Sequence, residues 1–121
     1  MIMFDSIFVL IGALFVKHYL VDFILQTQEQ IDSKGIYGNW IGLKHSFDHG
    51  AFTALVFWAF GLPFETSIYL GLLDLIVHYH IDYVKMRWGT RDMYTKRFWT
   101  EFGLDQLAHT LTYIELVYLA I

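Results

Sequence analysis

The 121-residue sequence contains no cysteine and a single proline, Pro63. Without cysteine, neither a disulfide framework nor a thiolate metal site can form. The sequence also lacks a glycine-rich phosphate loop, a nucleophile elbow, a low-complexity tract and an internal repeat. These absences leave nucleotide-binding proteins, elbow-type serine hydrolases and repeat proteins without support.

Hydrophobic residues are abundant instead: they make up 56% of the sequence, whose mean hydropathy is +0.44. Four apolar stretches each approach the roughly 20 residues that cross a bilayer core, and no alternating β pattern competes with them. We therefore predict an all-α fold, an antiparallel four-helix transmembrane bundle forming one membrane domain over residues 1–121. The expected helices span about residues 4–26, 40–62, 67–86 and 98–121. A small soluble bundle with an apolar core is the alternative.

The basic residues favour one side of this expected bundle. All eight are expected in or beside its two long connections, at positions 17, 34, 44, 85, 87, 91, 96 and 97. The positive-inside rule then places the connections Gln26–Trp40 and Lys85–Arg97 in the cytoplasm and both termini outside. The first apolar stretch lacks a basic n-region and a cleavage motif, so we expect a retained helix there and not a signal peptide. Pro63 is expected to end the second helix.

The second connection has five basic residues against one acid, Asp92, and tryptophans at its edges. Such a segment is expected to lie against anionic lipid head groups, although its charge can also serve only to set the topology. The basic residues concerned are Lys85, Arg87, Arg91, Lys96 and Arg97. A short basic loop of this kind is the only feature that would suit a nucleic acid, so we expect no nucleic-acid partner. The bilayer is the expected partner, and a homo-oligomer is left open.

The apolar stretch from Leu73 to Lys85 contains the most informative pattern in the chain. It places Asp74, His78 and Asp82 four residues apart, and this spacing stacks side chains on one face of a helix. Each of the other three helices supplies a similar pair. These pairs are His18 with Asp22, His45 with His49, and Asp105 with His109. Asp74 itself is expected either to orient His78 or to make a helix–helix hydrogen bond.

Antiparallel packing brings these residues into two layers, because the order of the pairs inverts between helices that run in opposite directions. The deeper layer is expected to contain His18, His49, His78 and His109. The layer one turn nearer the cytoplasm is expected to contain Asp22, His45, Asp82 and Asp105. Independent structural polar residues would have no reason to match in depth.

Ionisable groups inside hydrocarbon are costly and normally have a partner or a function. Imidazoles and carboxylates are ligands for divalent transition metals, so these eight residues predict a metal site with one or two ions, zinc in preference to iron or manganese. Two divalent ions against three aspartates leave one positive charge, which a hydroxide would cancel. Asp22, Asp82 and Asp105 are the candidate catalytic bases. A His–Asp hydrogen-bond network without metal and a bis-histidine haem are the alternatives.

The same residues carry a resemblance. The matching positions are His18-x-x-x-Asp22-Phe23-x-x-Gln26, His45, His78-x-x-x-Asp82-x-x-Lys85 and Asp105-Gln106-x-x-His109. This pattern resembles that of a family of unknown function, which consists of small multi-pass membrane proteins of bacteria and their phages. The resemblance spans nearly the whole chain and implies a helical protein of the bacterial inner membrane, host- or phage-encoded, but no activity. A fainter likeness to membrane-bound metal-dependent hydrolases rests only on His/Asp pairs in transmembrane helices.

Three functions follow as hypotheses. The first is a hydrolase that uses an intramembrane metal, near the cytoplasmic side, to attack an ester or a phosphoester. The second is a protein that transports or relays a divalent cation or protons. The third is a structural membrane protein whose small bundle is stapled by metal. The outer halves of the expected helices offer no polar path, and this favours the hydrolase over transport.

Overall fold

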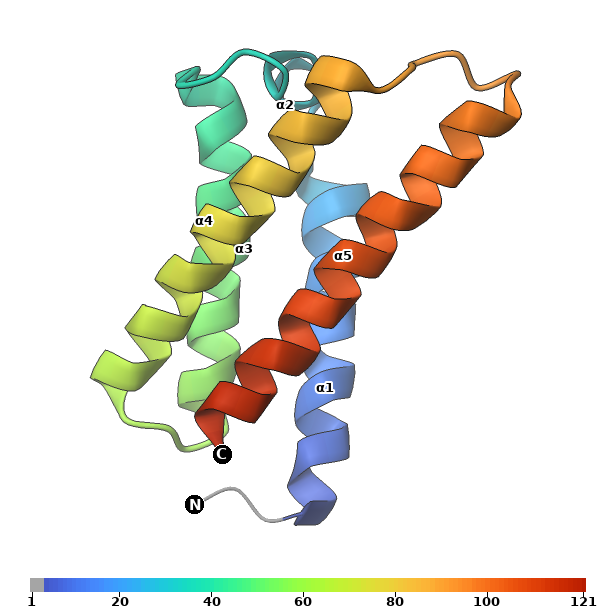
Figure 1. Ribbon diagram of the computed structural model, residues 1–121. Coiled ribbons are helices and arrows are strands. Elements are labelled where there is room, and N and C mark those ends of the chain that lie inside the picture. The colour runs from blue at the N-terminus through green and yellow to red at the C-terminus, as the bar shows by residue number, and fades with distance from the viewer. Residues whose placement is uncertain (1–3) are drawn as a thin grey trace.

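The computed structural model describes residues 4–121, with side chains from Ser6 onward, and no strand occurs within that range (Figure 1). The predicted all-α fold class is confirmed. The helices are α1 (Phe4–Tyr19), a π-helical segment (Leu20–Leu25), α2 (Gln28–Ser33), α3 (Trp40–Ala59), α4 (Phe64–Trp88) and α5 (Lys96–Ala120). The π-helical segment continues α1 directly, so the first long helix runs without a break to Leu25.

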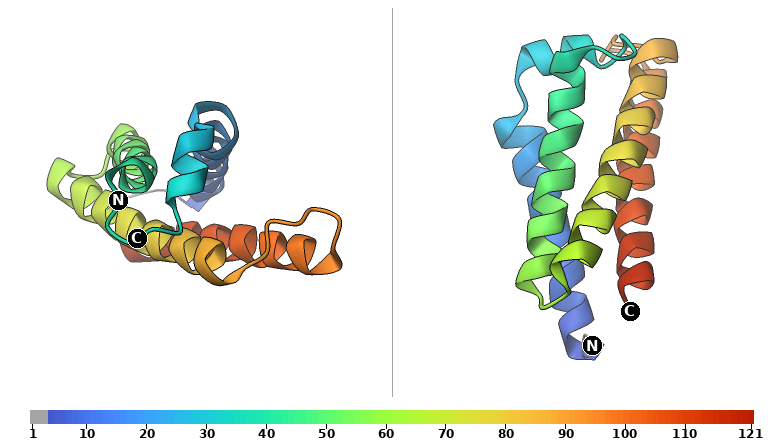
Figure 2. Two further views of the ribbon diagram at one scale, coloured as in Figure 1. Left: turned by 90° about the horizontal axis from the view of Figure 1, so that it is seen from above. Right: turned by 90° about the vertical axis from the view of Figure 1, so that its left-hand side faces the viewer.

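The four long helices form two layers, with α1 and α3 behind α4 and α5 (Figures 1 and 2). Each long helix packs against two others: α1 contacts α3 and α5, and α4 contacts α3 and α5. The beginning of α1 and the end of α5 lie at one end of the bundle, which we call the terminal end. The short helix α2 and the segment 89–95 lie at the opposite end, which we call the connection end.

Local sequence signals explain where the helices begin and end. Helix α2 begins with a capping box, because the Thr27 side chain accepts from the Gln30 amide while the Gln30 side chain accepts from the Thr27 amide. Helix α3 ends at Ala59, three residues before the expected end, because Gly61 takes a φ of +93°. Pro63 therefore does not end that helix, as the sequence suggested, but immediately precedes α4.

Small residues let α3 and α4 approach each other closely. Gly50 and Gly71 face each other, and a Cβ on either would lie within 2.6 Å of the other's carbonyl oxygen. Ser46 and Ala54 lie one turn to either side of Gly50, and Ser67 lies one turn before Gly71; all are buried. This small-xxx-small pattern on both helices is typical of tightly packed helix pairs in membranes. It brings the histidines of α3 next to those of α4.

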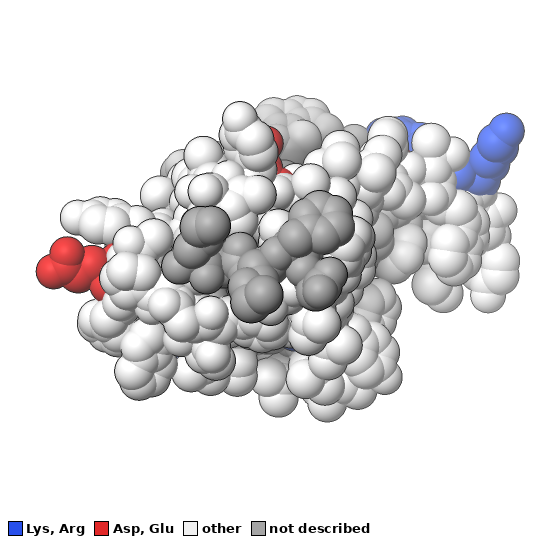
Figure 3. Space-filling model, turned by 90° about the horizontal axis from the view of Figure 1, so that it is seen from below, with Lys and Arg blue, Asp and Glu red and all other residues white. Residues whose placement is uncertain are grey.

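The interior of the bundle is divided along its length. Near the terminal end, buried leucines of α1 and α4 pack with Phe57, Tyr113 and Leu116 in a hydrophobic core. The middle and the connection half are polar inside, and among the described side chains the buried polar ones outnumber the buried hydrophobic ones. Large hydrophobic side chains are exposed instead along all four long helices. The surface of the terminal end visible in Figure 3 is almost uncharged.

One helical segment in the described range, Ser6–Leu25, is long and apolar enough to cross a membrane. Only 22% of its most apolar window is buried in the bundle, whereas the core helix of a soluble protein is mostly buried. A signal sequence near an N-terminus has the same length and composition. The four membrane spans expected from the sequence therefore stay a prediction.

Candidate metal centre

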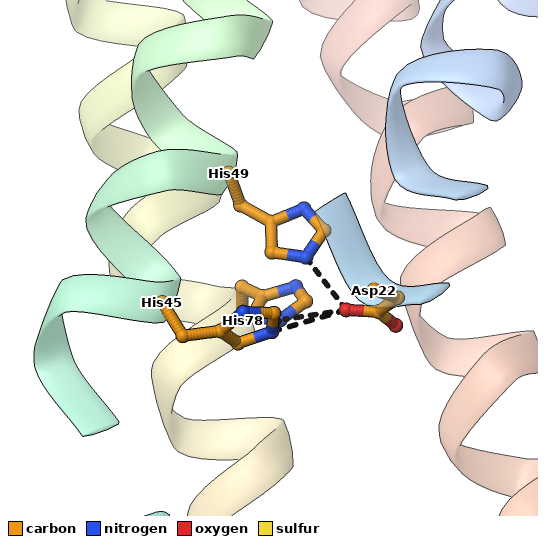
Figure 4. A group of neighbouring side chains, drawn as sticks. All are labelled: Asp22, His45, His49 and His78. Carbon is orange, nitrogen blue, oxygen red and sulfur yellow. Dashed lines mark hydrogen bonds and ion pairs between the residues drawn. The ribbon is translucent and has the colours of Figure 1, made fainter. Parts of the chain in front are cut away.

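Asp22 lies in the π-helical segment Leu20–Leu25, where the backbone turn is wider than in an α-helix. Single π turns of this kind occur often at functional sites. The Oδ1 atom of Asp22 lies 2.7 Å from Nε2 of His49 and 3.0 Å from Nε2 of His45, both on α3 (Figure 4). Nε2 of His78 on α4 is directed toward the same oxygen from 4.0 Å.

These four residues form a first group of candidate metal ligands. One ligand atom from each of Asp22, His45, His49 and His78 lies within 4.8 Å of the others. Zinc–nitrogen distances of roughly 2.0–2.1 Å in a tetrahedral site place ligand nitrogens about 3.3–3.4 Å apart. Nε2 of His45 and Nε2 of His78 are 3.4 Å apart. The three histidines are fully buried, so the four ligands of this group could enclose an ion without leaving an open position.

A second group consists of His78, Asp82 and His109. The two oxygens of Asp82 face different imidazoles: Oδ2 lies 3.0 Å from Nε2 of His78, and Oδ1 lies 3.2 Å from Nε2 of His109. This group offers three ligands, as catalytic zinc sites do. Both groups use His78, whose Nε2 has one lone pair and binds one ion. The groups are therefore alternative sites for a single ion.

The predicted layer of imidazoles is present at the centre of the bundle. The ring of His78 is stacked between those of His49, at 3.7 Å, and His109, at 4.1 Å. The ring of His18 lies 5.2 Å from that of His109. His18 nevertheless belongs to neither ligand group. Its ring nitrogens instead contact Asp22, Gln106 and Tyr113.

The structure thus brings all eight predicted site residues into one cluster. Six of them belong to the two ligand groups: Asp22, His45, His49, His78, Asp82 and His109. The other two lie beside the groups. His18 contacts Asp22 Oδ2 at 3.1 Å, and Asp105 Oδ1 lies 3.3 Å from Nε2 of His109. These two residues are placed to orient the ligands or to exchange protons with them, which are roles for residues next to a metal centre.

Lys17 is the largest departure from the sequence analysis, which placed every basic residue in or beside the long connections. Its side chain is instead buried inside the bundle, with 4% of the residue exposed. Its Nζ lies 3.0 Å from Nδ1 of His49, 3.1 Å from Oδ2 of Asp74 and 3.0 Å from the Tyr113 hydroxyl. A lysine in the middle of an apolar stretch is itself a signal of a buried partner, and the sequence analysis did not use it.

Asp74 does not orient His78, which was one of its two expected roles. Its Oδ2 accepts hydrogen bonds from Lys17 Nζ and from the Thr53 hydroxyl, the latter at 2.6 Å. The aspartate therefore joins α4 to α1 and α3. Lys17 also contacts Nδ1 of His49, the ring nitrogen that does not face Asp22. Asp74 and Lys17 together therefore hold His49, a ligand of the first group, in position.

Two further lysines reach carboxylates of the cluster from the connection end. Lys34, which follows α2, places Nζ 3.0 Å from Asp82 Oδ2, and Lys85 on α4 places Nζ 3.5 Å from Asp105 Oδ2. From the sequence, Lys85 was expected at lipid head groups, and Lys34 was used only for the topology. In the structure both residues also neutralise part of the acidic charge of the site.

The three lysines lower the negative charge of the cluster and therefore the number of metal ions that it can neutralise. The cluster now has four carboxylates and three ammonium groups, from Asp22, Asp74, Asp82, Asp105, Lys17, Lys34 and Lys85. With neutral imidazoles, four negative and three positive charges leave one negative charge. One divalent ion would leave one positive charge, but two ions would leave three in the buried interior of the bundle. The charges therefore favour one ion, not the two that the aspartates alone suggested.

A family model describes the same stretch of chain. It matches residues 9–121 and is described as DUF3307, a protein family of unknown function. The chain belongs to this family. The match includes every residue of the cluster, from Lys17 to Tyr113, and it confirms the family resemblance seen in the sequence. Comparisons with curated proteins and with solved structures gave no match.

Proposed function

We propose that this chain is an integral membrane metalloprotein that binds one divalent transition metal and hydrolyses an ester or a phosphoester. In this proposal the four long helices span the bacterial inner membrane, with the connection end in the cytoplasm and both termini outside. The observation that carries the proposal is the group His78, Asp82 and His109, a buried three-ligand set beside a further carboxylate, Asp105.

The distribution of side chains supports the membrane setting. Buried groups are mainly polar while large exposed side chains are hydrophobic on every long helix, which is the reverse of a soluble bundle. Many polar residues of α3, α4 and α5 are buried inside the bundle, among them His45, His78 and His109. Two of the eight basic residues, Lys17 on α1 and Lys44 on α3, lie within helices. The other six belong to the two connections or to the helix ends beside them. That asymmetry matches the positive-inside rule.

The three-ligand group suits catalysis better than the four-ligand group. A catalytic zinc site keeps a coordination position for water or substrate, whereas a structural site fills its shell with protein atoms. His78, Asp82 and His109 leave such a position, and Asp105 lies next to His109 on the side of the connection end. Zinc is the proposed metal, and the nitrogen and oxygen donors also suit iron or manganese.

The bound ion would supply Lewis acidity and a water molecule of lowered pKa. Asp105 is placed to act as the general base: it would accept a proton from the attacking water and return that proton to the oxygen of the leaving alcohol. One water and one ester bond are consumed, and an acid and an alcohol are released. Lys85, whose Nζ lies 3.5 Å from Asp105 Oδ2, would orient that carboxylate. Asp82 would bind the ion as one of the three ligands, and Asp22 has a positioning role in this scheme, because it is engaged by His45 and His49.

Transport or proton relay is less well supported. Contacts of 3.5 Å or less connect Lys85 through Asp105, His109, Asp82 and the remaining cluster to Lys17, Asp74 and Thr53. Beyond Thr53 toward the terminal end, the interior is the hydrophobic core around Phe57 and Leu116. A polar path through the described part of the bundle therefore stops about halfway.

Metal analysis of single-site variants tests the proposal and separates it from a structural staple. The full chain, purified in detergent, is expected to contain about one equivalent of metal. His109→Ala removes a ligand of the three-residue group only, and His49→Ala one of the four-residue group only. We expect His109→Ala to lose the metal and His49→Ala to retain it. His80→Ala, at an exposed histidine bonded to Tyr37, is the matched control.

The opposite result would identify the closed four-ligand site and support a structural staple. A metal-free wild type whose melting is unaffected by chelator would favour the hydrogen-bond network and overturn the proposal. Hydrolysis is tested with a chromogenic carboxylic ester and a chromogenic phosphodiester. Activity is expected in the metal-loaded wild type and is expected to disappear on chelation and in Asp105→Asn.

A further inference from the structure

A groove opens on the bundle surface between α4 and α5, near the connection end. Its volume is about 540 Å³, within the range of roughly 300–1,000 Å³ that small-molecule sites occupy. Its walls are mainly hydrophobic, formed by Ile81, Val84 and Trp88 of α4 and by Leu104 of α5. Val84, Trp88 and Leu104 are all more than half exposed. The groove therefore faces outward, toward the lipid in the proposed membrane setting.

The groove and the candidate metal centre meet at one residue. Asp105 lines the groove, and its Oδ1 lies 3.3 Å from Nε2 of His109. Asp105 itself is buried, with 6% of the residue exposed, so it forms part of the inner wall. A molecule in the groove would therefore lie one side chain away from the three-ligand group.

The polar groups of the groove favour an anionic ligand. Glu101, the half-buried acid of the groove, is already bound by the Thr90 amide at 2.8 Å and by Arg97. Lys85 is the cation of the groove, and about a quarter of its side chain is exposed. Within the described chain, the nearby Arg87 and Lys96 take part in no ion pair, whereas Arg91 and Arg97 are paired with Asp32 and Glu101. The helix ends beside the groove, where α4 finishes and α5 begins, therefore carry two positive charges that no ion pair within the described chain neutralises.

We infer that this groove binds an acyl chain of an anionic membrane phospholipid, with the lipid phosphate at Lys85. The inference rests on the proposed function and names its substrate class. Hydrophobic walls open to the bilayer suit a hydrocarbon chain, and a lysine at the polar end suits a phosphate. The ester and phosphoester bonds of a phospholipid lie between its chain and its head group. They would therefore lie next to Asp105, the residue proposed as the base.

Photocrosslinking of the full chain tests the groove directly. The protein is reconstituted in phosphatidylcholine vesicles that contain a trace of phosphatidylglycerol with a photoreactive diazirine in one acyl chain. Crosslinked residues are then mapped by mass spectrometry. We expect crosslinks to concentrate at Ile81, Val84 and Leu104. Leu111 is the matched reference, because it is as exposed as Leu104 on the same helix but does not line the groove. Equal labelling of both leucines would mean ordinary surrounding lipid and would overturn the inference.

Two pairs of variants sharpen this test. Leu104→Trp fills the groove and is expected to abolish crosslinking at Val84, whereas Leu111→Trp is expected to leave it unchanged. Lys85→Gln is expected to abolish the preference for phosphatidylglycerol over a phosphatidylcholine probe, and Arg91→Gln, at an arginine already paired with Asp32, to preserve it. A Leu104→Trp variant that still crosslinks at Val84 would overturn the inference. A probe preference that survives Lys85→Gln would also overturn the placement of the phosphate.

Repeating the crosslinking with metal-free and metal-loaded protein separates this inference from the proposed function. Concentrated labelling of the groove in both forms supports the lipid site, even if no metal-dependent hydrolysis is found. A metal-loaded protein with uniform labelling of α4 and α5 overturns the lipid site and leaves the metal centre intact.

Discussion

Lys34 Nζ lies 3.0 Å from Asp82 Oδ2, the same oxygen that faces His78 Nε2 at 3.0 Å. A lysine from the connection end thus shares a carboxylate oxygen with the candidate metal centre. The side chains of both residues are nearly buried, so little solvent lies between the charges. A metal ion bound by Asp82 would experience repulsion from this ammonium group.

Replacement of Lys34 is therefore expected to strengthen metal binding. Lys34→Gln removes the competing cation, and we expect the Kd for zinc to fall by about tenfold, or about 1.4 kcal/mol. Competition with a fluorescent zinc chelator measures the change. Lys44→Gln is the control, because Lys44 pairs with Asp48 near the surface and contacts no residue of the ligand groups. Weaker zinc binding in Lys34→Gln would instead show that Lys34 holds Asp82 in its binding position.

Loss of the buried Lys17 charge is expected to destabilise the bundle strongly. Lys17→Met leaves Asp74 buried without its cation, and breaking a buried pair from one side costs about 3–5 kcal/mol. Chemical unfolding in detergent, followed by circular dichroism, measures the loss. The double variant Lys17→Met/Asp74→Asn is expected to recover part of it, because no charge is then left without a partner. A single variant as stable as the wild type would contradict the paired state of these residues.

Close packing of α3 on α4 is expected to depend on glycine. A Cβ at Gly71 would lie 2.5 Å from the Gly50 carbonyl oxygen and 2.8 Å from the Ala54 Cβ. Gly71→Ala must therefore push the two helices apart, and we expect a loss of about 1–3 kcal/mol in unfolding free energy. Gly12→Ala is the control, because a Cβ there would meet nothing within 4 Å and alanine favours a helix. Equal effects of both substitutions would contradict the close approach.

Membrane topology can be tested with single cysteines, since the natural chain has none. Cysteines at Ser6 and Glu65 are expected to react with an impermeant maleimide from outside the cell. A cysteine at Thr90, in the segment between α4 and α5, is expected to react only after permeabilisation. This pattern follows from the position of the basic residues at the connection end. Labelling of Thr90 in intact cells would contradict the proposed orientation.

The sequence by itself determined the helices and the faces on which the site residues lie. Four-residue spacing places Asp74, His78 and Asp82 on one face of α4 whatever the surroundings, because a helix turn contains about 3.6 residues. The inverted order of His and Asp in α5 was enough to predict the layer of imidazoles, because short-range geometry and antiparallel direction decide the depth of each residue.

Only the tertiary structure decided which charges meet. Lys17 and His18 are adjacent in the chain and point about 100° apart, so helix geometry alone does not say which of them faces the interior. The partners of Lys17 come from three other helices, and Lys34 reaches Asp82 from a connection whose path no periodicity describes. The wider turn at Asp22 and the groove beside Asp105 likewise depend on how the helices cross. Such contacts join residues far apart in the chain, and their energies are set by packing rather than by local spacing.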